Sequence, residues 1–590
     1  MTEPFHEPAC SGNTCRSNLI RRFGEAVQKR RSGLVISQEE LAERADLHRT
    51  YVADIKRGAR NPTLLTIKKL ATGLGVSGRL VLGDQMKSLA PSKVFPCQLI
   101  VSCIVVYGAP IPVRAEDKPP AAKLAQTNSQ LTTSDGQSGL LNYWLRSQSS
   151  SFSAWDLGGQ FRARYEHTEN LGAVDFSSKG GQSSTDLGLL RTLVHVGYNP
   201  TPWLSLYTEA RDSRGLWDEP NPNPDQDTLD LHQAFVRIGN PQLLPLIAKV
   251  GRQELIYGDE RLVGQSDWTN VRRTFDAAKL RYEVKGFWVD AFVSRPVVVW
   301  NDHFNESDSQ DWFSGIYAST TKLIPWQESE VYFLARNTST GSPQFYGPPP
   351  DPQGATPRDI YTIGVHFKSL PGKMGGWDYN LEAAGQFGQF KETTAGAPAS
   401  AAGRNLVQQA YAAVASGGYT WTDAPGKPRA GLEYLYSSGD SNPTDDKHET
   451  FDNLFPTNHR QFGIMDIFSW QNDRILRFMG SIQPLESLTL AGDYRLVWLA
   501  DTLDSFYTNK GARRGGLAPT DGTGYGINPN YNSYVGSEID LVATYTFKQY
   551  TSLQAGIGHF FVGDYVKSSL AGIGGARDAT FVYAQFTFNF

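Results

Sequence analysis

Arginine side chains recur inside short segments in which apolar and polar residues alternate, from residue 157 to the end of the chain. A guanidinium group stays charged and binds a carboxylate through two parallel hydrogen bonds, so a row of them on one surface suits an acidic polymer. The basic residues at polar positions of these segments are Arg162, Arg164, Arg191, Arg211, Arg237, Lys279, Arg281, Arg336, Arg429, Arg477 and Arg495. Arg252 and Arg261 are further candidates for a constriction, although the phase of the strand is ambiguous because Arg252 shares a face with Ala248 and Val250.

Carboxylates occupy the same kind of position, which leaves a second interpretation open. They are Glu166, Glu209, Glu283, Asp290, Glu330, Glu382, Glu433, Asp493, Glu538 and Asp540. Arginine and carboxylate groups that face one another neutralise one another. The pattern therefore favours equally an anion-selective path and a wall of internal ion pairs.

Other residue patterns offer little chemistry. The stretch GDSNPTDDKHETFD contains Asp440, Asp445 and Asp446, whose oxygens are the ligands that Ca²⁺ prefers, but the spacing is not that of an EF-hand and a solvated loop is favoured. His195, His366 and His559 are isolated, and the chain has no nucleophile elbow, zinc motif or phosphate-binding loop. We expect neither catalysis nor a cofactor.

The alternation itself predicts strands. In GGQFRARYEH, Phe161, Ala163 and Tyr165 share one face, and Arg162, Arg164 and Glu166 share the other. Such segments recur, giving eighteen candidate strands of roughly ten residues. Their links alternate between short turns, such as 199–202 and 284–286, and long polar segments, such as 212–229, 337–358, 438–470 and 500–535.

This regular segregation of turns and loops is typical of an outer-membrane β-barrel, with the turns in the periplasm. An even number of strands returns both ends of the barrel to that side. The wall then faces lipid with its apolar residues, the charged residues face the interior, and eighteen strands are expected to enclose water instead of a packed core. Tyr198, Trp203, Trp288, Trp421 and Trp498 lie near strand ends and suit the aromatic girdles at the two interfaces, with a packed aromatic as the alternative for each.

The last strand has a feature of its own. In ATFVYAQFTFNF, Val582, Ala584, Phe586, Phe588 and Phe590 share one face. A terminal Phe590 with aromatic residues at alternate positions before it resembles the strand that the barrel-insertion machinery recognises.

Two longer blocks carry a family resemblance. VGRQELIYGDERLVGQSDWTNVRRTFDAAKLRY and SSGDSNPTDDKHETFDNLFPTNHRQFGIMDIFSW look like signatures of the alginate-export family of outer-membrane proteins, and the resemblance covers residues 157–590. It implies an 18-stranded monomeric barrel that lets an anionic polysaccharide, or related small solutes, cross the outer membrane.

The N-terminal part has a different character. Ser37 and Glu40 form a capping box before a helix with Leu41, Ala42 and Ala45 inward. SQEELAERADLHRTYVADIKRGARNPTLLTIKKLATGLGV resembles the XRE/Cro-type helix-turn-helix domain over residues 19–83. The resemblance implies that Gln38 contacts a DNA phosphate and that His48, Arg49, Thr50, Tyr51 and Asp54 face the major groove.

Between the two parts lies a signal-like stretch. Lys87 and Lys93 precede an apolar run from Val94 to Tyr107, which is too short for a spanning helix, and the pattern predicts cleavage after Ala115. Residues 1–115 carry 17 Lys and Arg against 9 Asp and Glu, a net charge of +8. Because the whole chain has a net charge of −4, residues 116–590 have a net charge of −12. The cysteines, Cys10, Cys15, Cys97 and Cys103, all precede the cleavage site.

The predicted order is therefore a tail (1–18), a small all-α helix-turn-helix domain (19–83), a signal peptide (86–115), a flexible segment (116–156) and an 18-stranded antiparallel transmembrane β-barrel (157–590). A repressor domain bound to DNA cannot accompany an unfolded barrel through an export channel, so we interpret residues 1–85, cytoplasmic if made at all, as a gene-model fusion. The expected partners are outer-membrane lipid, the solute and, for residues 19–83, DNA. A DNA-binding transcriptional regulator, a non-selective general porin and a structural or adhesion protein are the alternatives.

Overall fold

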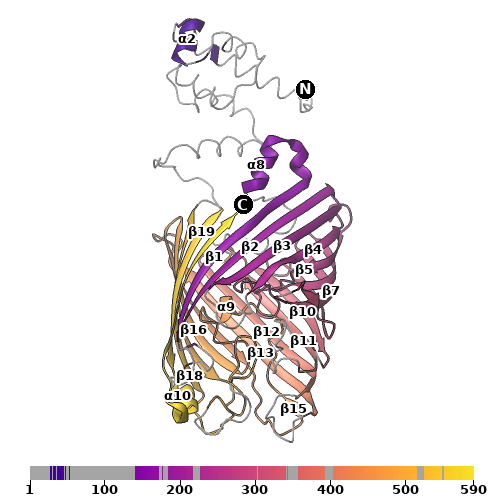
Figure 1. The fold of residues 1–590 in the computed structure, drawn as a ribbon, viewed down its shortest axis with the longest axis vertical. Helices are drawn as coiled ribbons and strands as arrows, with labels where there is room; N and C mark the ends of the chain where they lie inside the picture. Colours follow the sequence, from indigo (N-terminus) through magenta and orange to yellow (C-terminus); the bar gives the residue numbers. More distant parts are fainter. Residues whose placement is uncertain are drawn as a thin grey trace, which may run out of the picture. The chain divides into compact units, whose positions relative to one another are not determined.

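The computed structural model describes residues 27–28, 31–32, 34, 36–45, 47, 52, 140–171, 176, 184–216, 226–301, 303–340, 342, 356–392, 403–514, 524–547 and 550–590. The chain divides into two units, Met1–Pro120 and Ala121–Phe590. Figure 1 shows the barrel of the second unit and helix α2 of the first.

In the first unit, helix α2 (Gln38–Arg44) begins as the sequence predicts. The Ser37 side chain accepts a hydrogen bond of 3.0 Å from the Glu40 backbone N–H, which satisfies one of the free donors at the helix start. The Glu40 carboxylate pairs with Arg44 one turn later instead of closing the capping box. Leu41, Ala42 and Ala45 are buried as expected. The predicted tail and signal peptide lie outside the described residues.

The second unit is a closed antiparallel barrel. Its eighteen wall strands are β1 (Trp155–Glu169), β2 (Ser184–Thr201), β3 (Leu204–Leu216), β4 (Asp227–Ile238), β5 (Leu246–Gln253), β6 (Phe275–Val284), β7 (Phe287–Val298), β9 (Asp311–Thr320), β10 (Gln327–Thr338), β11 (Arg358–Ser369), β12 (Trp377–Lys391), β13 (Asn405–Thr420), β14 (Arg429–Ser437), β16 (Asp473–Leu485), β17 (Leu488–Leu499), β18 (Tyr534–Phe547), β19 (Thr551–Val562) and β20 (Ala579–Asn589). Each pairs with the next along the chain, and β1 pairs with β20 from Gln160↔Asn589 to Glu169↔Thr580. The predicted barrel is confirmed.

The remaining elements are short. Strands β8 (Glu306–Ser307) and β15 (Lys447–His448) lie in loops, as do helices α9 (Asn458–Phe462), α10 (Asp564–Leu570) and η2 (Ala571–Ile573). Helix α8 (Leu140–Gln148) and the 3₁₀ turn η1 (Ser150–Ala154) precede β1. No helix among the described residues is long and apolar enough to cross a membrane.

Helix α8 departs from the prediction of a flexible segment over residues 116–156. Asn142 is buried; its amide Nδ2 donates to Asp156 Oδ1 at 2.5 Å, and its Oδ1 accepts from the Leu157 backbone N–H at 2.6 Å. The prediction is therefore wrong for residues 140–154, because the side chain of Asn142 in the helix makes two hydrogen bonds to the first strand. Sequence periodicity does not reveal such a contact.

Turns and loops segregate to opposite ends as predicted. Short links such as 202–203, 285–286 and 486–487 join strands at the end of the barrel where β1 begins and β20 finishes, here called the turn end. Long links, including 254–274 and 438–472, lie at the opposite, loop end (Figure 1). The length of the link after a strand therefore shows whether that strand runs toward the turn end or toward the loop end.

The wall has an apolar outer face. In β13, Val407 and Tyr411 are exposed at the odd-numbered positions, whereas Gln408, Ala410 and Ala412 are buried at the even ones. The other strands also expose large apolar side chains, which together are called the apolar belt here, and the buried charged ones face inward. Because apolar groups face outward and polar groups inward, the surrounding solvent of this wall is lipid.

Aromatic residues mark the edges of this belt. Trp203, Trp326, Trp377 and Trp421 are exposed at the turn end, which agrees with the predicted girdle. Trp288 is different: its indole stacks on Tyr257 and on Tyr317 inside the barrel. It shares the inner face of β7 with buried Asp290, so its assignment to a girdle is wrong.

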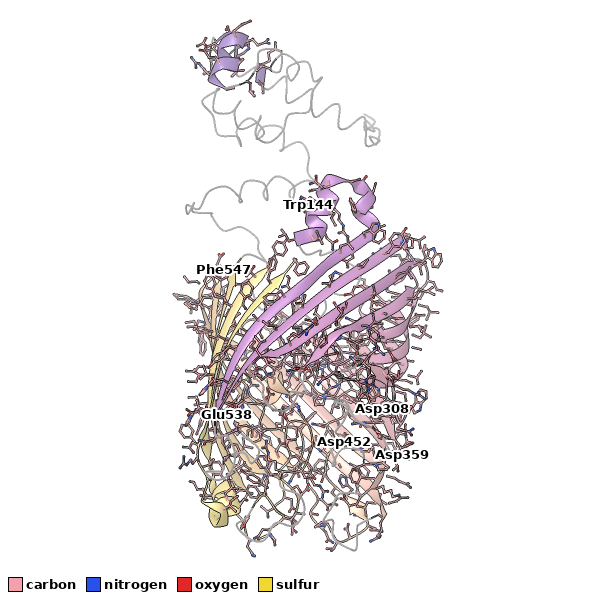
Figure 2. All side chains as sticks on the ribbon, viewed as in Figure 1. Trp144, Asp308, Asp359, Asp452, Glu538 and Phe547 are labelled. Atoms are coloured by element: carbon pink, nitrogen blue, oxygen red, sulfur yellow. The ribbon has the colours of Figure 1, made fainter. Side chains whose placement is uncertain are left out.

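The lumen is not simply filled with water. Long loops enter it and form an apolar cluster around Phe451, Phe455, Phe468 and Trp470, packed against inward residues of the wall such as Phe313. The expectation of an unpacked interior is therefore wrong where these loops enter. Figure 2 places Asp452 and Glu538 within the lower part of the barrel.

Candidate functional site in the barrel lumen

Two loops meet inside the barrel, and they contain the two sequence blocks singled out above. Val263 of loop 254–274 forms a parallel bridge with Phe455 of loop 438–472. The Phe455 backbone N–H donates to the Leu262 carbonyl at 2.9 Å, and the Gly264 N–H donates to the Phe455 carbonyl at 2.8 Å. We call these paired loops the two-loop plug.

Three predicted arginines hold the plug to the wall. Arg162 donates to the carbonyls of Asp267 (2.7 Å) and Trp268 (3.1 Å), and Arg191 donates to the Asp267 carbonyl (3.0 Å) and carboxylate (2.9 Å). Arg211 donates to the Val271 carbonyl and pairs with Asp227. These guanidinium groups are buried and face inward as predicted, but they bind the protein's own backbone.

Arg164 contacts the plug through an aromatic ring. Its guanidinium carbon lies 3.7 Å from the centre of the Trp268 ring, and Nη1 donates to the Trp268 carbonyl at 2.7 Å. On its other side Trp268 stacks on His459, with ring centres 3.5 Å apart. One indole therefore joins the wall, loop 254–274 and loop 438–472.

A chain of ion pairs crosses the inner wall from β18 to the plug. Arg495 pairs with Glu538 (2.7 Å) and Asp540 (2.5 Å), and Arg477 pairs with Asp493 (2.5 Å) and Glu433 (3.4 Å). The chain of ion pairs ends at the plug, where Arg261 donates to Glu433 at 2.8 Å and lies 3.9 Å from Glu382. The arginines on this side are neutralised internally, as the second interpretation of the sequence expects.

Further predicted arginines also have carboxylate partners. Arg281 binds Asp290 through Nε (2.6 Å) and Nη2 (3.0 Å). Arg336 binds Asp311 at 2.8 Å, and a bidentate pair joins Arg429 to Asp378 at 2.8 and 2.6 Å.

Arg252 lies on the outer face, so its assignment to the lumen is wrong. It shares that face of β5 with exposed Val250, and it binds Asp276 of β6 at 2.9 and 3.0 Å. The inner face of β5 instead carries Ile247, Lys249 and Gln253. Leu246, Ala248 and Val250 form an apolar lipid-facing row, and this row is the sequence signal that identifies Lys249 as inward.

Lys249, which sequence reasoning missed, belongs to an inward cluster of three cations near the turn end. The strand register places it directly opposite Arg237 of β4 and Lys279 of β6. Like charges opposite one another destabilise a sheet unless an anion compensates them. Lys279 has Asp290 at 3.3 Å, whereas no carboxylate of a described residue forms an ion pair with Lys249.

Aromatic rings line the wall beside this cluster. The Lys249 ammonium lies 3.7 Å from the centre of the Phe235 ring, an attractive cation–π contact. Phe235 stacks on Tyr207 at 5.0 Å, and Tyr207 stacks on His195 at 5.5 Å. A cationic group beside flat apolar rings can hold a carboxylate and the carbon skeleton that carries it.

The proposed calcium ligands serve other purposes. Asp440 Oδ1 accepts the Asn442 N–H at 3.1 Å and Asp445 Oδ1 accepts the Lys447 N–H at 2.8 Å, so each closes a turn of its own loop. Burial, reinforced by Asp504, raises the pKa of Asp440 to about 7. Among the described residues, no group of three His, Cys, Asp or Glu side chains is arranged to hold a metal ion.

Of the predicted DNA-contacting residues, the structure places Gln38 at the start of α2. His48, Arg49, Thr50, Tyr51 and Asp54 lie outside the described residues. At the other end of the chain, Phe590 and Gly159 exchange backbone hydrogen bonds of 2.9 and 3.0 Å, so the final residue completes the β1–β20 seam.

Comparison with known proteins matches both parts. The family model for alginate export matches residues 153–572, and a helix-turn-helix model matches residues 29–81. Control protein C.BamHI of Bacillus amyloliquefaciens is 45% identical over 67 residues, 11% of this chain and 83% of that protein. Control protein C.MunI of a Mycoplasma species is 40% identical over 57 residues, 10% of this chain and 77% of that protein.

The solved structures with a similar fold are outer-membrane proteins with low sequence identity to this chain. OccK11 (OpdR) of Pseudomonas aeruginosa has 12% identity and a TM-score of 0.43, covering 74% of this chain and 96% of its own. A BenF-like porin of Pseudomonas fluorescens Pf-5 has 9% identity and a TM-score of 0.45, covering 74% and 99%.

Proposed function

The chain belongs to the alginate export family, and we propose that its barrel lets an anionic polysaccharide such as alginate, or related small acidic solutes, cross the outer membrane. The protein is an outer-membrane porin with a helix-turn-helix domain before the barrel. The proposal concerns the solute and the residues that contact it.

The cation cluster of Arg237, Lys249 and Lys279 is the observation that carries this proposal. The inward arginines that bind carboxylates or the two-loop plug contribute structure more than selectivity. Among the described residues no carboxylate forms an ion pair with Lys249, and its side-chain nitrogen lies next to the Phe235 ring. A carboxylated sugar reaching this part of the lumen meets a counter-charge and an apolar surface together.

Planar-bilayer recording of the full chain tests the proposal. We expect anion selectivity and a concentration-dependent block of the current by uronate oligomers, because a bound oligomer occupies the path of small ions. Neutral oligomers of equal length are the control. Equal block by both would favour a non-selective general porin, and absence of any conductance would favour a structural role.

Residues 29–81 match the helix-turn-helix family model, which supports DNA binding by that part if it is expressed. We retain the proposal that residues 1–85 are a gene-model fusion, since a folded DNA-bound domain and an exported barrel precursor exclude each other physically. The signal at 86–115, cleavage after Ala115 and recognition of Phe590 by the barrel-insertion machinery belong to the same proposal.

N-terminal sequencing of the outer-membrane fraction tests this second proposal. A mature start near Glu116 is expected. An intact Met1 in the membrane would overturn it, and a soluble fragment ending before Met86 that binds DNA would support the regulator as a separate product.

A further inference from the structure

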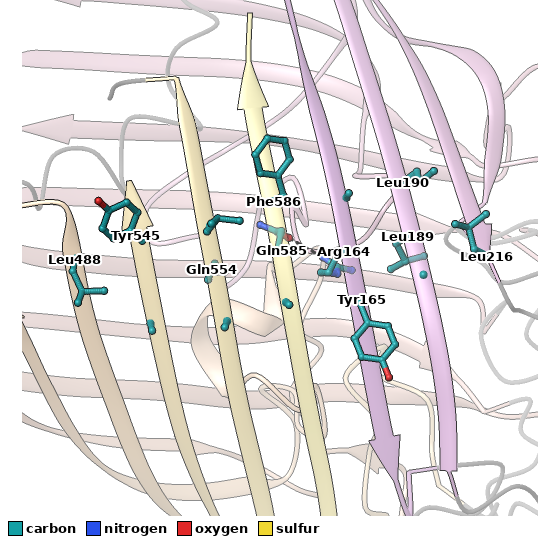
Figure 3. Close-up of a pocket in the computed structure, with 16 residues that line it drawn as sticks. Arg164, Tyr165, Leu189, Leu190, Leu216, Leu488, Tyr545, Gln554, Gln585 and Phe586 are labelled. Atoms are coloured by element: carbon teal, nitrogen blue, oxygen red, sulfur yellow. Dashed lines mark hydrogen bonds between the residues drawn. The ribbon is translucent and has the colours of Figure 1, made fainter. Parts of the chain in front are cut away.

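The lipid-facing wall contains a groove across the seam where the barrel closes. It has a volume of about 600 Å³ and extends from Leu488 of β17 to Leu216 of β3, with Phe586 of β20 and Tyr165 of β1 between them (Figure 3). Neighbouring strands lie about 4.8 Å apart, so seven adjacent strands give a length of roughly 29 Å. This length matches an extended apolar chain and exceeds what one side chain could fill.

The floor of the groove is formed by small side chains in register. Ala543 lies opposite Ala555, and Ala555 lies opposite Ala584. On one side of the alanines the groove is lined by Leu553 and Phe586, which are also opposite one another. On the other side the alanines are followed along the strands by Leu541 and Ile557, which are exposed and opposite one another. Three alanines between two rows of bulky residues leave a trough that the protein itself does not fill.

Charge is present at one end of the groove. On β3, Arg214 lies opposite Leu190, a residue of the groove lining. The Arg214 side chain is 51% exposed and pairs at 2.8 Å with Asp212, which is 31% exposed on the same outer face. The two groups together offer a cation and an anion at the loop end of an otherwise apolar groove.

The groove also has a direction. Barrel strands tilt about 35–45° from the membrane normal, and the groove runs across them, so it is inclined at roughly 45–55°. Lipid chains that merely surround a protein stand close to the normal. A void at the protein surface loses dispersion contacts, so a chain that adopts this inclined path gains packing that an ordinary neighbouring lipid does not.

We propose that this groove is a specific lipid site, which holds one acyl chain of a phosphate-bearing lipid with its headgroup at Arg214 and Asp212. The phosphate pairs with Arg214, and a headgroup ammonium, where the lipid has one, pairs with Asp212. The site is independent of the solute carried through the lumen, and it requires only that the wall faces the membrane.

Native mass spectrometry of the full chain in detergent tests the site with three defined diacyl lipids: phosphatidylethanolamine, phosphatidylglycerol and diacylglycerol. Ala555→Phe fills the groove, and Ala278→Phe makes the same change at an exposed position of β6 outside it. We expect one retained phospholipid per wild-type chain, at least tenfold less retention in Ala555→Phe, and wild-type retention in Ala278→Phe. Heat-dependent gel mobility verifies that each variant is folded.

Arg214→Gln tests the headgroup. We expect it to reduce the preference for the two phospholipids over diacylglycerol about tenfold while leaving diacylglycerol retention unchanged. Equal lipid retention by wild type and Ala555→Phe would overturn the proposal. An equal loss of bound lipid in Ala555→Phe and Ala278→Phe would overturn it as well. A wild-type dimer that Ala555→Phe converts to a monomer would assign the groove to a second copy of the chain and would also overturn it.

Discussion

The guanidinium of Arg164 lies over the face of the Trp268 indole, 3.7 Å from the ring centre. Because Trp268 also stacks on His459, this contact links the first wall strand to both loops of the two-loop plug. The plug is thus a continuation of the wall, held by a sandwich of a cation and two rings.

Replacing Trp268 with Ala is expected to loosen the plug. Removing a large packed aromatic ring costs on the order of 3 kcal/mol, and the stacking partners Arg164 and His459 lose their common contact. We expect a lower unfolding temperature and larger, noisier single-channel conductance. Trp312→Ala, which removes an exposed indole of the outer face, is the control. Unchanged conductance in Trp268→Ala would separate the plug from the conduction path.

Arg261→Met is expected to destabilise the folded barrel. Glu433 accepts from Arg261 and would keep only its longer contact with Arg477, while Glu382 loses the nearby cation. Breaking a buried pair from one side costs about 3–5 kcal/mol. Urea unfolding followed by tryptophan fluorescence measures this. The double variant Arg261→Met with Glu433→Gln should recover part of the loss, and the absence of any recovery would refute the pairing.

Lys249→Gln should lower the anion-over-cation permeability ratio about threefold. A unit charge several ångströms from the path, acting through a water-rich lumen, is worth roughly 0.6 kcal/mol. Reversal potentials in a salt gradient measure the ratio. Arg252→Gln removes a cation from the outer face of the same strand and should leave it unchanged. If Arg252→Gln lowered the permeability ratio more than Lys249→Gln does, Arg252 would face the lumen and the structural assignment would be wrong.

The loop around Asp440 should loosen as pH rises through about 7. Burial, then the nearby Asp504, raise the pKa of the Asp440 carboxyl to about 7, and burial also raises the pKa of Asp504. A carboxyl whose pKa is raised in the folded protein favours the folded loop at lower pH, and this advantage is lost as the group ionises between its unfolded pKa and pH 7. Hydrogen exchange of residues 438–452 at pH 5.5 and 8.5, corrected for intrinsic rates, measures the change.

Asp440→Asn removes the titration at that position and is the matched variant for the pH experiment. We expect its exchange to depend less on pH than that of the wild type. Identical pH dependence in the two proteins would show that another group controls the loop.

How far the sequence predicts the structure depends on which contacts a residue makes. Alternation and link length predict the strands, the loop segregation and the inward direction of Arg162 or Arg495, because each follows from local order along the chain. For β5 the phase is ambiguous in the sequence, since Arg252 shares a face with two apolar residues. The apolar row of Leu246, Ala248 and Val250 identifies the opposite face of β5 as the inner one only once the apolar face is known to meet lipid.

The plug could not be predicted in the same way. Its contacts join residues such as Leu262 and Phe455, which are far apart in the chain and meet inside a barrel whose interior was expected to hold water. The arginines that look suited to a solute in the sequence bind backbone carbonyls of the plug instead. Their role is set by what folds into the lumen, which strand periodicity does not encode.

The pairing of Gln160 with Asn589 joins residues 429 positions apart in the sequence, and it closes the ring. Without β20, strand β1 would keep a row of unsatisfied amide and carbonyl groups along one edge, and β19 would do the same. Such an open sheet can pair with a second copy of the chain at either edge. Closure of the ring therefore protects the protein from aggregation as well as giving it its shape.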